Sequence, residues 1–135
     1  MLGVNNDNAY VITKNSTATY ILKYDSNGNL IYENFISDIY IQPFGYTQQP
    51  RMMLFHNGFI YTIFNSDSGE PYNAVLVKID EITGASTFQI HPFITQRTGF
   101  SLAIDYNSNT LYFGSIIIDQ QNYVFYNYSI NTFCL

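Results

Sequence analysis

Residues 55–64, FHNGFIYTIF, contain the clearest structural signal in this 135-residue chain. Asn57-Gly58 is a two-residue turn signal, and apolar and β-branched residues flank it on both sides. Such a dipeptide between two apolar runs is typical of a tight β-hairpin. The stretch therefore predicts two antiparallel strands that meet at residues 57 and 58.

The same arrangement of a polar turn and a tyrosine-bearing apolar run occurs three times along the chain. The other two copies are NNDNAYVIT (5–13) and YNSNTLYFGS (106–115). Their central residues, Tyr10, Tyr61 and Tyr112, follow one another at intervals of 51 residues. A fixed period of about 40–50 residues is typical of stacked or radial repeats.

Each repeat is expected to form one antiparallel sheet of four short strands joined by hairpins. In the middle repeat the expected strands are 52–58, 59–66, 74–80 and 86–92, with a turn at Gly84. In the first repeat, 9–13 is the second strand, and 19–25 and 29–36 follow it. In the last repeat, the stretch from residue 101 leads to 110–118, 123–129 and finally 132–135, TFCL.

The repeat also includes the third expected strand of each unit. Lys23-Tyr24-Asp25 matches Lys78-Ile79-Asp80 and, in the last third, Asn127-Tyr128-Ser129. We therefore expect one all-β domain over 1–135, with repeats at about 1–36, 51–92 and 99–135.

Composition supports strands and excludes several classes of partner. Aromatic residues make up 18% of the chain and charged residues 11%, and aromatic residues favour strands. Five basic residues and a net charge of −5 argue against nucleic acid and anionic membrane surfaces. No apolar run approaches a membrane span, the N-terminus lacks a signal-peptide pattern, and the single cysteine, Cys134, excludes an intramolecular disulfide.

Two stretches of the middle repeat, GFIYTIF (58–64) and VLVKIDEITG (75–84), resemble the blade repeats of β-propeller proteins, in particular the quinoprotein type. The resemblance implies a partial β-propeller-like array, because such rings usually close with four to eight blades. The exposed sheet edges of an open array invite pairing with another chain. Phe88 stands where such repeats often carry tryptophan, and no cofactor-binding residue is carried over. A two-sheet β-sandwich is the alternative architecture.

The sequence contains no pattern of catalytic or metal-binding residues. His56 and His91 have no partner at zinc-ligand spacing. Asp25, Asp80 and Asp105 each stand beside an expected turn, where a turn-forming role is expected. We therefore expect no enzyme activity, no cofactor and no metal.

One face of the array is predicted to make contacts. The loops at 14–18, 37–51, 65–73, 92–99 and 118–122 are expected to emerge at the same end of the sheets. They carry aromatic, amide and charged side chains, which suit a contact surface for protein or carbohydrate. The candidate binding residues are Tyr46, Gln48, Arg51, Asp67, Glu70, Tyr72 and Arg97. The alternative is that Arg51 and Arg97 only pair with acids and keep the loops soluble.

The leading functional hypothesis is a non-enzymatic structural or adhesive module that self-associates or contacts another protein chain. It would belong to a larger assembly such as a virion, an appendage or a surface layer, so an extracellular or virion location is favoured. The alternative is a glycan-binding or glycan-acting propeller fragment with its site around Arg51 and Arg97. The source, the compartment, the oligomeric state and glycosylation at Asn15 or Asn127 stay open.

Overall fold

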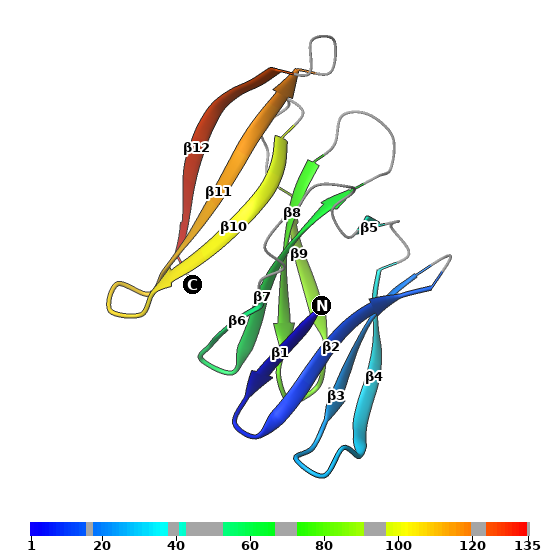
Figure 1. Cartoon of the computed structure of the whole chain (residues 1–135). Coiled ribbons are helices and arrows are strands. Elements are labelled where there is room, and N and C mark those ends of the chain that lie inside the picture. The colour runs from blue at the N-terminus through cyan, green and yellow to red at the C-terminus, as the bar shows by residue number, and fades with distance from the viewer. Residues whose placement is uncertain are drawn as a thin grey trace.

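The chain is all-β, as expected. A computed structural model describes residues 1–15, 18–37, 41–42, 53–66, 73–90, 97–119 and 124–134. Within these ranges it contains twelve strands and no helix, and all the paired strands are antiparallel (Figure 1). The strands form three sheets, and each sheet is drawn from one third of the chain.

The first sheet contains four strands in the order in which they occur along the chain. They are β1 (Leu2–Asn5), β2 (Asn8–Lys14), β3 (Thr19–Tyr24) and β4 (Leu30–Ser37). Asn6 and Asp7 connect β1 and β2 with φ values of 47° and 60°. Asn and Asp tolerate this left-handed region better than other non-glycine residues, so they allow a two-residue turn here.

The second sheet contains the hairpin predicted at Asn57-Gly58. Its strands are β5 (Ile41–Gln42), β6 (Met53–His56), β7 (Phe59–Ser66), β8 (Asn73–Asp80) and β9 (Ser86–Ile90). The turn residues have φ values of 50° and 78°, which confirms the tight hairpin. Both β5 and β6 pair with β7, at opposite ends of that strand. The two-residue strand β5 lies within 37–51, which the sequence predicted to be a loop.

The third sheet departs from the expected pattern. It contains β10 (Arg97–Asp105), β11 (Thr110–Asp119) and β12 (Val124–Cys134), with β11 in the centre. The prediction of a separate strand at 132–135 is wrong, because β12 continues to Cys134 without a turn. Asn131 interrupts the apolar pattern, yet it pairs with Phe113 inside the ladder.

The register also corrects the match between third strands. Tyr10 lies opposite Lys23, and Tyr61 lies opposite Lys78. Tyr112 lies opposite Thr132, so Thr132 and not Asn127 is the equivalent of the two lysines. The error arose because β11 and β12 extend further from the Tyr112 pair than the corresponding strands of the other sheets.

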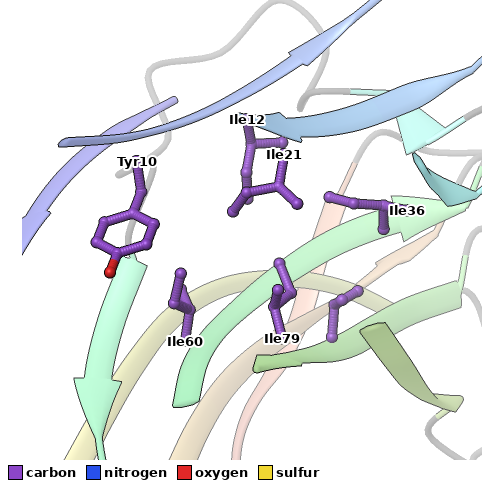
Figure 2. Packing of buried hydrophobic residues seen from close by; sticks show 7 residues of the cluster. Tyr10, Ile12, Ile21, Ile36, Ile60 and Ile79 are labelled. Atoms are coloured by element: carbon purple, nitrogen blue, oxygen red, sulfur yellow. The ribbon is translucent and has the colours of Figure 1, made fainter. Parts of the chain in front are cut away.

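The second sheet is packed between the first and the third. Side chains of the first sheet point toward the second and form one buried cluster with it (Figure 2); its members are Tyr10, Ile12, Ile21, Ile36, Ile60, Val77 and Ile79. A second buried cluster joins the second sheet to the third and contains Tyr61, Ile63, Leu76, Leu102 and Leu111. Since three sheets stack, the alternative of a two-sheet sandwich is wrong.

Successive side chains of the second sheet point to opposite faces, so this sheet contributes to both clusters. Ile60 and Tyr61 are neighbours on β7, yet they belong to different clusters, because successive side chains of a strand point to opposite faces. Each fully buried aliphatic or aromatic side chain contributes about 1.5–3 kcal/mol relative to exposure. The tight turns of the three sheets lie together at one end of the molecule (Figure 1).

Candidate functional site

The contact face predicted from the sequence falls almost wholly outside the described residues. This applies to Tyr46, Gln48, Arg51, Asp67, Glu70 and Tyr72. Arg97 begins β10, where its backbone lies opposite Ile117, and its side chain is outside the described part. Binding around Arg51 and Arg97 therefore stays a prediction.

A buried polar contact joins the first sheet to the turn between β8 and β9. Glu81, in this turn, is 9% exposed. Its carboxylate accepts a hydrogen bond from Asn5 Nδ2 at 2.7 Å. Its backbone carbonyl accepts from Lys23 Nζ at 3.0 Å and from the Tyr32 hydroxyl at 3.4 Å. We call these residues, together with Tyr10, the Glu81 junction.

The electrostatics of the Glu81 junction indicate a structural role. Burial, followed by the negative charges of Glu81 and Asp80, raises the pKa of Tyr32 to about 12. Burial and then the charge and hydrogen bond of Glu81 raise the pKa of Tyr10 as well. Both hydroxyls therefore stay protonated near neutral pH and cannot act as general bases there. The Lys23 ammonium lies 5.4 Å from the Tyr10 ring centroid and completes the junction with a cation–π contact.

A glycine lets the β8–β9 turn come close to the first sheet. Gly84 has a φ of +71°. A Cβ at this position would lie 2.6 Å from Asn34 Nδ2 and 2.8 Å from Tyr32 Cε2. The Asn34 amide also donates a hydrogen bond to the Thr83 carbonyl in the same turn. Only glycine meets both the backbone and the packing requirement here.

A smaller polar contact joins the second sheet to the third. His56 Nε2 lies 2.5 Å from Asn109 Oδ1, and Asn57 Nδ2 lies 3.3 Å from the same oxygen. The His56 ring meets the Tyr106 ring edge-on, with centroids 5.2 Å apart. Since its Nε2 faces an amide oxygen, His56 is engaged in sheet packing. Among the described residues, no group of three or more His, Cys, Asp or Glu side chains is placed to hold a metal ion.

The turn-forming role predicted for three aspartates is confirmed. Asp25 accepts hydrogen bonds from the backbone and side chain of Asn29, Asp80 from those of Thr83, and Asp105 from those of Ser108. These hydrogen bonds stabilise the ionised form, so they lower the pKa of each carboxyl below its usual value. The three carboxylates therefore close turns at the ends of hairpins.

The outer face of the first sheet is exposed and most of its side chains are apolar. Leu2 and Val4 are each 68% exposed, Phe35 is 53% exposed and Leu30 is 51% exposed. Pairing across the strands places these side chains on one face. We call it the Val4 face; its apolar members are Leu2, Val4, Val11, Tyr20, Leu22, Tyr24, Leu30 and Phe35. Glu33, opposite Leu22, and Thr13, opposite Tyr20, are its exposed polar members.

The outer face of the third sheet carries the third tyrosine of the repeat. Tyr112 is 37% exposed, whereas Tyr10 and Tyr61 are 1% and 2% exposed. Its neighbours across the strands, Ala103 and Thr132, are exposed too. We call this surface, with Cys134, the Tyr112 face. Sequence reasoning missed both faces. In the strand 19–24, TYILKY, both faces carry apolar or aromatic residues, Ile21 on one and Tyr20, Leu22 and Tyr24 on the other, and this pattern indicates burial on two sides.

Comparisons with known proteins give no relative. The chain matches no protein-family model, no curated protein and no solved structure. In its described part there is also no helix long and apolar enough to cross a membrane.

Proposed function

We propose that the chain is a non-enzymatic structural or adhesive module that works by self-association or by contact with another protein chain in a larger assembly. The observation that carries the proposal is the Val4 face, on which four large apolar side chains are more than half exposed. Exposure of several large apolar side chains on one face is typical of an interaction site. A partial β-propeller-like array, in which sheets follow one another face to face, is the architecture that fits this role.

The chemistry of the described residues supports the same proposal. The described aspartates with lowered pKa values close turns, Glu81 fastens two sheets, and His56 contacts Asn109. Each of these groups therefore has a packing role that accounts for its position. A contact module needs only rigid sheets with an apolar outer surface.

Native mass spectrometry and sedimentation velocity test the proposal. The chain of 15.5 kDa is expected to form dimers or larger species that dissociate on dilution. High salt should strengthen or preserve the association, because apolar burial drives it and salt does not screen that term. A chain that stays monomeric up to its solubility limit would contradict self-association.

A further inference from the structure

The two sheet-to-sheet interfaces of the molecule are built in the same way. In the first, Tyr10, Ile12 and Ile21 pack on a face of the second sheet that contains Met53, Phe55, Ile60, Val77 and Ile79. In the second, Tyr61, Ile63 and Leu76 pack on a face of the third sheet that contains Leu102, Ile104 and Leu111. Each time, the face of one sheet that carries the repeat tyrosine covers the opposite, apolar face of the next.

Strand register shows which residues of the three sheets are equivalent. In the hairpins that precede the tyrosines, Val4 pairs with Ala9, Phe55 with Ile60, and Ile104 with Leu111. Val4 is therefore the equivalent of Phe55 and Ile104. Leu2 is in the same way the equivalent of Met53 and Leu102, which pair with Thr62 and Phe113.

The Val4 face thus corresponds to the faces that the tyrosines cover in the other two sheets. Phe55, the equivalent of Val4, lies with its ring centroid 5.3 Å from that of Tyr10. The Tyr112 face shows the opposite deficit, because its tyrosine occupies the position of Tyr10 and Tyr61 but remains exposed. The Val4 face is therefore without a tyrosine-bearing sheet to cover it, and the Tyr112 face is without an apolar sheet face to cover.

We propose that the Tyr112 face of one copy of this chain packs on the Val4 face of a second copy and so repeats the packing between its own sheets. The inference rests on the proposed self-association and assigns its partner and its two surfaces. The interface is heterologous, because different surfaces meet, and such an interface leads to closed rings or open stacks. The alternative is that the Val4 faces of two copies pack on each other. Neither internal interface pairs two faces of this kind, because each pairs a tyrosine-bearing face with an apolar one.

Two single substitutions block the two faces separately. Val4→Glu places a charge where the equivalent Phe55 meets a tyrosine ring. Ala103→Glu acts on the Tyr112 face at the position equivalent to Gly3, since both residues lie opposite the repeat tyrosine. A Cβ at Gly3 would lie 2.9 Å from Met53 Sδ, and Leu54, the equivalent residue of the second sheet, packs in the other interface. Glutamate at Ala103 therefore places a charge where the internal interfaces hold a glycine or an apolar side chain.

The control is Ile82→Glu. Ile82 is 80% exposed in the β8–β9 turn and lies on neither face, so the substitution makes the same change of an exposed apolar residue to glutamate. Circular dichroism and urea unfolding check that all three variants are folded. Leu2→Glu, at an equally exposed site of the Val4 face, replaces Val4→Glu if the latter does not fold.

Sedimentation velocity tests whether the two faces meet. It is measured for each variant alone and for a mixture of the two blocking variants. We expect the wild type and Ile82→Glu to associate, and each blocking variant alone to associate at least tenfold more weakly. The mixture should form a 1:1 heterodimer and stop there, because Ala103→Glu keeps an intact Val4 face and Val4→Glu keeps an intact Tyr112 face. Native mass spectrometry identifies the heterodimer by its mass.

Four outcomes overturn the inference. Ala103→Glu that self-associates like the wild type would show that the Tyr112 face takes no part. Blocking variants that form no heterodimer when mixed would show that the two faces do not meet. Wild-type association that neither variant weakens would contradict the inference alone and leave the proposed function in place, whereas a monomeric wild type would contradict both.

Discussion

Backbone conformation and sheet packing both require a residue without a Cβ at position 84. Its φ of +71° is costly for any residue with a side chain, and the first sheet leaves no space for a Cβ. Gly28, in the β3–β4 turn, has a similar φ of +83° but no heavy atom within 4 Å of the Cβ position. Comparing the two glycines therefore separates the cost in stability of the backbone conformation from the cost of packing a Cβ.

Gly84→Ala should destabilise the protein more than Gly28→Ala. The left-handed backbone alone costs a residue with a Cβ about 1–2 kcal/mol, which is the loss expected for Gly28→Ala. Gly84→Ala must in addition displace Asn34 and Tyr32, so we expect it to cost roughly 3 kcal/mol or more. Urea unfolding of both variants measures the difference. Equal losses would mean that the turn can move away from the first sheet without penalty.

Single residues differ in how far the sequence predicts their role. Asp25, Asp80 and Asp105 could be assigned to turns, because an aspartate bonds backbone groups two or three residues further on. Glu81 could not, because Asn5, which its carboxylate binds, is 76 residues away in sequence. A buried carboxylate and a solvated one look the same in a sequence when their partners come from another sheet.

Hairpins were predictable at the scale of the element because their signals are local. The Asn57-Gly58 turn and strands β6 to β9 follow from residues a few positions apart. The register of β12 was not predictable in this way. Its pairing depends on the length of β11 and on a shift in register between Ile116 and Ile117, which no local residue pattern announces.

The three repeat tyrosines should contribute unequally although they occupy equivalent positions. Tyr61→Ala removes a ring that lies in a buried cluster, so we expect a loss of about 3–5 kcal/mol. Tyr112→Ala removes a ring that is 37% exposed on the outer face of the third sheet, and we expect a loss below about 1.5 kcal/mol in the monomer. Urea unfolding at low protein concentration measures both. A large loss for Tyr112→Ala in the monomer would mean that its face is already covered within the chain.

The period of 51 residues predicted three sheets, but it does not predict how they stack in the whole molecule. Stacking depends on which face of each sheet meets the next. The absence of a side chain at Gly3 and Gly84 sets how closely the first and second sheets approach. The sheets contact mainly their neighbours, so the stability of such a stack is approximately a sum of sheet and interface terms. The second sheet takes part in two interfaces, whereas each outer sheet takes part in one.

Hydrogen exchange should therefore rank the sheets by the number of their covered faces. We expect the slowest amides in β7 and β8, near Ile60 and Val77, because only a large opening exposes the centre of the stack. The amides of β2 and β11 should exchange faster in the monomer. If copies stack through the Val4 and Tyr112 faces, protection of β2 and β11 should rise with protein concentration while that of β7 and β8 changes little. Mass spectrometry of peptides after exchange at two concentrations measures both effects. Slowest exchange in an outer sheet of the monomer would contradict the central position of the second sheet. Protection of β2 and β11 that does not change with protein concentration would contradict stacking between copies, but not the stacking of sheets within the chain.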